Sequence, residues 1–164
     1  MTLQIVELDP KLHIRQHFDC GNINRNLYLQ KLAAQHRRSG FSSTYVLSDT
    51  KKPSTVFGYY SISAAQIELG VIPKQNLRKL PKVPIPAARV GQLAVDLKEQ
   101  GKGYGALLLQ NAIKKALLVR EQSLGIHMII VDADSQNAAS FYRKFGFREC
   151  NSSGRTLYLC LGSD

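Results

Sequence analysis

The chain has 164 residues, 44% of them hydrophobic, and a formal net charge of +10. That length suits one domain with a full hydrophobic core, so we predict a single domain over residues 1–164. The sequence has no apolar run long enough to span a membrane and no signal-peptide pattern at its start, which predicts a cytoplasmic protein without a membrane partner. Cys20, Cys150 and Cys160 lack zinc-ligand spacing and are too few for a disulfide framework, so we expect no metal site.

Apolar periodicity and turn residues predict the elements of the first half of the chain. A strand over residues 3–8 precedes a helix from Asn22 to about Arg38, which ends at Gly40. Residues 44–48 and 55–64 form two strands joined by a turn-rich segment, which predicts a hairpin with a bulge at Gly58. Residues 71–88 contain four of the six prolines, so we expect a long irregular loop, typical of an insertion or a lid.

In the second half, an apolar run over residues 90–95 predicts a buried strand, followed by a glycine-rich turn and a long amphipathic helix. Residues 126–131 predict another strand, and residues 134–145 a short helix that Gly146 ends as a left-handed cap. We expect Asp132 and Asp134 to serve the start of that helix rather than to form an acid–base pair. Residues 147–150 and 156–161 predict a closing strand pair. The order β-α-β-β-β-α-β-α-β-β indicates a mixed α/β domain around one twisted sheet.

The glycine-rich turn is the most informative feature of the sequence. It consists of Gln100, Gly101, Lys102, Gly103, Tyr104 and Gly105. Glycines at a helix start let the backbone approach a ligand, and the helix dipole adds partial positive charge there, so a phosphate or pyrophosphate is the natural ligand. A glycine-rich turn is also a common connector. The P-loop ending and the Rossmann spacing are both missing, which excludes those two phosphate-binding motifs.

Basic residues gather in two windows without any acidic residue, over residues 20–48 and 69–95. Such windows favour a polyanionic partner, namely RNA, DNA or a phosphorylated ligand, over a basic surface that only aids solubility. Candidates for phosphate contacts within these windows are Arg37, Arg38, Arg78, Lys79, Lys82 and Arg89.

Three segments together resemble the GNAT superfamily of acetyl-CoA-dependent N-acetyltransferases. These are the strand Leu93-Ala94-Val95, the loop Gln100-x-x-Gly103-x-Gly105 and the segment Phe141-Tyr142-x-x-x-Gly146-Phe147. The resemblance covers nearly the whole chain. It implies the GNAT fold, a single mixed, twisted, largely antiparallel sheet flanked by helices, with acetyl-CoA as the acetyl donor.

The resemblance also implies roles for individual residues. It implies that Leu93, Ala94 and Val95 bind the pantetheine arm of the coenzyme. The loop of Gln100, Gly101, Lys102, Gly103, Tyr104 and Gly105 would bind the pyrophosphate. Asn137 would make a further contact with the coenzyme. The backbone N–H of Val95 would polarise the thioester carbonyl. Tyr142 would be the general acid for the departing thiolate. Alternative roles stay open for Tyr142, as a tyrosine packed on the sheet, and for Asn137, as a helix-start residue.

Further segments are similar to the GNAT toxins of bacterial type II toxin–antitoxin systems. They are Phe18-Asp19-Cys20-Gly21, residues 40–46, Gly58-Tyr59-Tyr60-Ser61-Ile62, Pro84-Ile85-Pro86 and residues 92–96. That group acetylates the α-amino group of aminoacyl-tRNA and stops translation. Its antitoxins are ribbon-helix-helix proteins, and its members are often homodimers. Gln92 departs from the arginine that many relatives carry, which weakens any role assumed for that side chain.

Chemistry gives mild support to an aminoacyl-tRNA acceptor. A free α-amino group has a pKa of about 8, and esterification of the carboxylate lowers it, so much of the amine is already neutral and no general base is evident or required. A lysine side chain, with a pKa of about 10.4, needs more help. Two alternatives remain: a GNAT enzyme acting on a protein or small-molecule amine, and a non-catalytic relative that binds nucleic acid or a partner protein.

Overall fold

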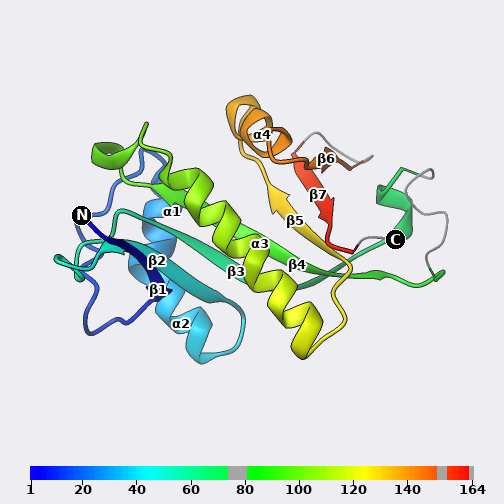
Figure 1. Cartoon of the computed structure of the whole chain (residues 1–164), viewed down its shortest axis with the longest axis horizontal. Helices are drawn as coiled ribbons and strands as arrows, with labels where there is room; N and C mark the ends of the chain where they lie inside the picture. Colours follow the sequence, from blue (N-terminus) through cyan, green and yellow to red (C-terminus); the bar gives the residue numbers. More distant parts are fainter. Residues whose placement is uncertain (74–80, 151–154, 163–164) are drawn as a thin grey trace. The chain divides into compact units, whose positions relative to one another are not determined.

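The computed structural model describes residues 1–73, 81–150 and 155–162, and Figure 1 traces its elements along the sequence. These residues divide into two compact units, residues 1–63 with 91–114 and residues 64–90 with the described part of 115–164. The described strands form a seven-stranded sheet in the order β1-β2-β3-β4-β5-β7-β6. Strands β3 and β4 and helix α3 each contribute residues to both units.

The first unit contains the amino-terminal strands and most of the helical segments. Its elements are β1 (Leu3–Glu7), α1 (Ile23–Leu27), a π-helical turn η1 (Tyr28–Leu32), α2 (Ala33–Arg38), β2 (Ser43–Asp49), the start of β3 (Gly58–Ile67), the end of β4 (Ile85–Val95), the 3₁₀ turn η4 (Leu97–Glu99) and the first part of α3 (Tyr104–Gln122). Strands β1 and β2 pair antiparallel, as do β2 and β3. The predicted first strand, first helix and hairpin are therefore confirmed, with a π turn inside the helix.

Two tyrosines on β3 show how helices cover both faces of this part of the sheet. The Tyr59 hydroxyl donates to the carbonyl of Arg25 on α1 at 2.6 Å, and the Tyr60 hydroxyl donates to Asn111 Oδ1 on α3 at 2.7 Å. Because neighbouring side chains of a strand point to opposite faces, α1 and the first part of α3 lie on opposite faces. On the α1 face, Tyr59 stacks on Tyr28 and meets the edge of Phe18 in a fully buried cluster.

Two sequence expectations in this region are wrong. Gly58 is the first residue of β3 rather than a bulge, and a Cβ there would lie 2.8 Å from the Ala94 carbonyl oxygen and 2.9 Å from Leu108. Close approach of neighbouring backbone therefore explains this glycine. The predicted loop over residues 71–88 is also too long, because β4 already begins at Ile85. Pro86 is tolerated since it stands at the start of the strand, before the register with β5 begins at Ala87.

The second unit completes the sheet. It adds the 3₁₀ turn η2 (Leu69–Val71), β5 (Met128–Asp132), α4 (Gln136–Arg143), β6 (Arg148–Glu149) and β7 (Thr156–Cys160) to its parts of β3, β4 and α3. Strand β5 runs parallel to β4 and antiparallel to β7, which also pairs antiparallel with β6. The mixed, largely antiparallel sheet and its closing strand pair are confirmed.

The ends of α4 are fixed by two local features. The Ser135 hydroxyl accepts a hydrogen bond from the Ala138 N–H at 3.1 Å, so Ser135 caps the helix start, not Asp132 or Asp134 as expected. Gly146 has a φ of +93°, which confirms the predicted left-handed cap. None of the helices in the described ranges combines the length and apolar character needed to cross a bilayer.

Candidate functional site

The turn before α3 has the backbone of an anion-binding loop. Gly101 and Gly103 have φ values of +81° and +83°, a region that side chains disfavour, while a Cβ on either residue would meet nothing within 4 Å. Both glycines are thus required by the backbone path and not by crowding. The first N–H groups of a helix have no intrahelical acceptor, and the first turn of α3 carries no acidic residue. No carboxylate within that first turn competes with a phosphate for these donors.

Gln100 fastens this loop to the end of β4. Its amide Nε2 donates to the carbonyl of Val95 at 2.9 Å and to the carbonyl of Cys20 at 3.1 Å. The two acceptors come from the end of the strand and from the segment that leads into α1. A single side chain therefore joins the loop to the predicted pantetheine strand and to the segment before α1.

The edge of β4 near Val95 offers a line of backbone donors. The N–H of Asp96 donates to the Phe57 carbonyl at the β3 side, at 2.8 Å. Since successive N–H groups of a strand point to opposite edges, the N–H of Val95 points away from β3. Among the described residues, the register of β4 with β5 ends at Val90, before Leu93 is reached. The resemblance to the GNAT superfamily implies that a pantetheine arm adds to this stretch as a strand would.

Two other loop residues are held by local contacts. Lys102 Nζ lies 2.7 Å from Glu99 Oε2, and this contact raises the pKa of Lys102. The cation predicted for the pyrophosphate is therefore shared with a carboxylate. Tyr104 is buried, with its ring parallel to Phe57 at a centroid distance of 5.9 Å, so only its backbone is suited to a ligand.

Asn137 and Tyr142 belong to the second unit. Asn137 is exposed in the first turn of α4, after the Ser135 cap. Tyr142, on the same helix, is only 4% exposed, and its ring packs against Phe141 and Phe147 with centroid distances of 5.3 and 5.7 Å. The packing fixes the ring, so its hydroxyl has a defined position.

The predicted phosphate-binding cations differ in their surroundings. Arg37 pairs with Glu7 at 2.5 Å, which raises the pKa of Arg37, and Arg89 pairs with Asp132 at 2.5 Å. Arg38 and Lys82 are exposed. Arg78 and Lys79 lie outside the described residues. Two of these six cations are therefore already compensated within the protein.

A cavity of about 310 Å³ that the sequence analysis did not predict opens on the α1 face, beside the end of β4. Its lining consists of Tyr28, His36, Phe41, Ser42, Ser61, Ser63, Gly91 and Gln92. The Tyr28 hydroxyl lies 2.6 Å from Ser42 Oγ and 3.1 Å from His36 Nδ1, which gives the cavity a hydrogen-bonded polar wall. One indication of this cavity is present in the sequence. Because successive side chains of a strand point to opposite faces, Ser61 and Ser63 are expected on the same face of β3.

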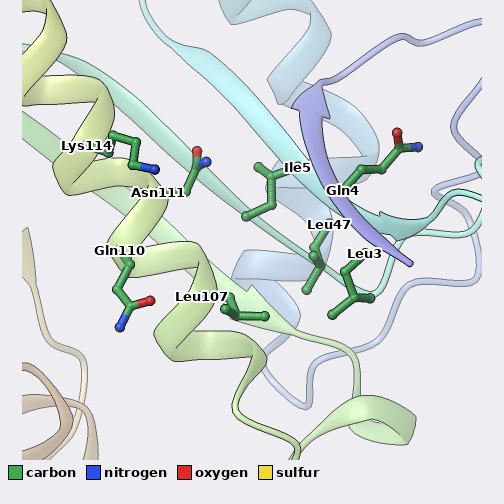
Figure 2. Close-up of a pocket in the computed structure, with 8 residues that line it drawn as sticks. All are labelled: Leu3, Gln4, Ile5, Leu47, Leu107, Gln110, Asn111 and Lys114. Carbon is green, nitrogen blue, oxygen red and sulfur yellow. The ribbon is translucent and has the colours of Figure 1, made fainter. Parts of the chain in front are cut away.

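A second hollow, of about 390 Å³, lies between β1 and α3 (Figure 2). Leu3, Ile5 and Leu107 supply its apolar walls, and Asn111 and Lys114 reach toward it from α3. None of the residues predicted for coenzyme or acceptor binding lines it. Within the described ranges, no group of three or more histidine, cysteine, aspartate or glutamate side chains could hold a metal ion.

Comparison with known proteins gives a family model and a relative that match most of the chain. Residues 42–149 match the family model described as an acetyltransferase (GNAT) domain. The chain is 32% identical over 130 residues to a tRNA-acetylating toxin of Mycobacterium tuberculosis (strain ATCC 25618 / H37Rv), a match that covers 79% of this chain and 75% of that protein.

Solved structures give the same family. AtaT complexed with acetyl-methionyl-tRNAfMet superposes with a TM-score of 0.89 at 28% identity, covering 97% of this chain and 95% of that one. AtaTR bound with AcCoA superposes with a TM-score of 0.83 at 30% identity, covering 97% and 94%. Both similarities extend over almost the full length of the two chains compared.

Proposed function

The chain belongs to the GNAT acetyltransferase family, and on this premise we propose that it is a toxin that transfers the acetyl group of acetyl-CoA to the α-amino group of an aminoacyl-tRNA. The observation that carries the proposal is the near full-length similarity to AtaT, which was solved with acetyl-methionyl-tRNAfMet, together with the intact loop over residues 100–105. Acetylation of the α-amine removes the nucleophile of peptide-bond formation, so translation stops.

The donor half of the site is supported by backbone geometry. Acetyl-CoA supplies an activated acetyl thioester. In our account, the N–H groups at the start of α3 bind the pyrophosphate, and Leu93, Ala94 and Val95 bind the pantetheine arm. The N–H of Val95 stabilises the negative charge that develops on the acetyl oxygen, a contribution that is large where water is excluded. Asn137 provides a further contact to the coenzyme.

Tyr142 is the proposed general acid. A phenol has a pKa of about 10 and a thiol of about 8.5, so full proton transfer to the thiolate is uphill unless the site tunes it. A strong hydrogen bond from the tyrosine hydroxyl to the thiolate supplies much of the same stabilisation. The rigid packing of the ring against Phe141 and Phe147 supports such a positioned donor.

The acceptor end of the tRNA enters, in this account, through the cavity beside Gln92. Its polar wall of Tyr28, Ser42 and His36 orients the aminoacyl ester, whose amine attacks while neutral. Arg38, Lys82, Arg78 and Lys79 remain candidates for tRNA phosphates. Arg37 and Arg89 can join them only by leaving Glu7 and Asp132.

We further propose that residues 1–164 act as one domain in the cytoplasm, as a homodimer, and that a cognate ribbon-helix-helix antitoxin neutralises the toxin. Solved relatives include a mutant AtaT toxin bound to the C-terminus of the antitoxin AtaR, which supports an antitoxin for this chain. Co-expression with a candidate ribbon-helix-helix antitoxin and purification of a complex would test this part of the proposal.

The proposed activity is tested by incubating the purified protein with radiolabelled acetyl-CoA and a pool of charged tRNA, with deacylated tRNA as the control. Label on charged tRNA alone is the expected result. Label on deacylated tRNA, or label on added proteins or small amines with none on tRNA, would reject the proposed acceptor and favour another GNAT activity.

A further inference from the structure

A basic hollow of about 370 Å³ lies in the first unit, and none of the residues assigned a role above lines it. The loop over residues 10–16 forms one side, and Gln30 and Lys31 of the π turn form the other. Lys11, Arg15 and Lys31 supply three cations, and Gln16 and Gln30 supply two amides. Its lining is chiefly polar, in contrast to the mainly apolar lining of the cavity beside Gln92.

Local hydrogen bonds build the loop side of the hollow. The Asp9 carboxylate accepts from the Lys11 N–H at 2.9 Å, and the Asp9 carbonyl accepts from the His13 N–H at 2.9 Å. The Asp9 N–H in turn donates to Nδ1 of His13, which is 3% exposed. The Ile14 N–H donates to the Ser54 carbonyl at 2.9 Å. The loop is therefore a fixed structure, and one oxygen of the Asp9 carboxylate beside it accepts a backbone N–H.

The π turn builds the other side. A π turn inserts one extra residue into a helix, and such turns are frequent at functional sites. Arg15 Nη1 lies 3.5 Å from the Leu29 carbonyl, at the limit of a hydrogen bond, and Gln30 Nε2 donates to the Phe18 carbonyl at 3.1 Å. The contact with Leu29 involves one of the five N–H donors of the guanidinium. Arg15 is thus oriented without its charge being neutralised.

The lining of the hollow carries a net positive charge. No acidic side chain lines it, and among the residues that the structure describes, neither Lys11, Arg15 nor Lys31 forms an ion pair. Four other cations of the described chain do pair with carboxylates, namely Arg37, Arg89, Lys102 and Arg143. Three clustered charges without a partner raise the local affinity for anions.

We propose that this hollow binds the sugar–phosphate backbone of the RNA substrate, an inference that rests on the proposed function. Lysine, arginine and amide side chains are the groups that contact phosphate and sugar oxygens, and such contacts position an RNA without reading its sequence. The hollow also lies within reach of the acceptor side. Tyr28, which lines the cavity proposed for the acceptor end, stands in the same π turn three residues before Lys31.

The test uses the double variant Lys11→Ala/Lys31→Ala, whose side chains are exposed. Lys51→Ala/Lys114→Ala is the matched control, because it removes the same charge from exposed positions of the same unit outside the hollow. Binding of deacylated tRNA is measured by filter binding over a range of salt concentrations. Acetyl transfer is measured on intact aminoacyl-tRNA and on an aminoacyl-adenosine fragment.

The variant is expected to bind tRNA at least about tenfold more weakly, and the slope of log affinity against log salt is expected to fall by about 2. The KM for intact aminoacyl-tRNA should rise, while transfer to the fragment and the control variant should match wild type. An equal loss on the fragment, or an equal loss in the control variant, would overturn the assignment. So would normal tRNA binding combined with weakened antitoxin binding, which would assign the hollow to an acidic protein segment.

Failure of the proposed function gives a different pattern. If the wild-type protein acetylates no aminoacyl-tRNA, the acceptor assignment fails by itself. The binding of deacylated tRNA still decides whether the hollow holds an RNA backbone, since that measurement requires no acetyl transfer.

Discussion

The amide of Gln100 donates to the carbonyl of Val95 at 2.9 Å, and this bond ties the loop proposed to bind the pyrophosphate to the strand edge proposed to receive the acetyl group. A second bond from the same amide to the Cys20 carbonyl extends the link toward α1. In the proposed site, one side chain therefore connects the segment that would bind the pyrophosphate with the segment that would bind the acetyl end of the coenzyme. Preorganisation of this kind lowers the cost of ordering a site when the ligand binds.

Gln100→Ala is expected to raise the KM for acetyl-CoA on the order of tenfold while kcat changes little. It removes two hydrogen bonds worth about 1 kcal/mol each, and both hold the loop rather than the reacting atoms. Steady-state kinetics checks this. Gln110→Ala is the matched control, because Gln110 lines the hollow of Figure 2. A fall in kcat at unchanged KM would contradict the assigned role.

Gly103→Ala should weaken coenzyme A binding about tenfold. The φ of +83° costs a side chain about 1–2 kcal/mol, although no atom blocks the new methyl group. Gly125→Ala is the control, since that glycine is exposed and a Cβ there also meets nothing within 4 Å. Calorimetric titration with coenzyme A measures both. Equal affinities in the two variants would show that the loop conformation is not required.

Tyr142→Phe should lower kcat by about 10²–10⁴-fold and leave the KM for acetyl-CoA within about twofold. The ring contacts with Phe141 and Phe147 survive the substitution, so folding should be retained. Tyr60→Phe is the control: it removes the bond to Asn111 and should cost about 1 kcal/mol of stability without loss of activity. Expression in growing cells gives a second readout, in which Tyr142→Phe should relieve growth arrest. Undiminished kcat would remove Tyr142 from the mechanism.

His13 predicts a pH dependence of stability. Burial lowers its pKa below the ordinary value of 6.5, with Asp9 acting in the opposite direction. The unfolded chain then binds more protons than the folded one, so this contribution is present above pH 6.5 and is lost as the pH falls. Burial also lowers the pKa of His127, which adds in the same direction.

Urea unfolding between pH 7 and pH 5 checks this prediction. His13→Asn, whose side-chain oxygen can still accept the Asp9 N–H, should flatten the decline in the free energy of unfolding. His17→Asn, a substitution of an exposed histidine, should retain the wild-type slope. Identical slopes in all three proteins would contradict the role of His13.

Much of the fold was predictable because its signals are local. The turn-rich segment of the hairpin and the glycine turn before α3 depend on neighbouring residues, and each appears in the structure where it was predicted. Gly58 and Pro86 were misread for a different reason. Gly58 is required because the Ala94 carbonyl approaches it closely. Pro86 is tolerated because pairing of β4 with β5 begins only at Ala87. Neither relationship is visible from nearby sequence.

At the candidate site, too, contacts between residues far apart in the sequence could not be predicted. The loop over residues 100–105 could be recognised because its conformation requires glycines. The pairing of Arg37 with Glu7 and of Arg89 with Asp132 joins residues 30 and 43 positions apart, so a count of basic residues could not reveal it. The π turn was equally hidden, since its apolar pattern is that of an ordinary helix. The basic hollow depends on that turn and was not predicted.

Mass spectrometry of the aminoacyl group is the most direct test of the proposed reaction. Charged tRNA is incubated with acetyl-CoA and the wild-type protein, and the ester is then cleaved with mild base. The proposed reaction predicts an N-acetyl amino acid in the released fraction, absent when acetyl-CoA is omitted and strongly reduced with Tyr142→Phe. Release of only unmodified amino acids, with acetyl groups recovered on protein or on no acceptor, would contradict acetylation of aminoacyl-tRNA.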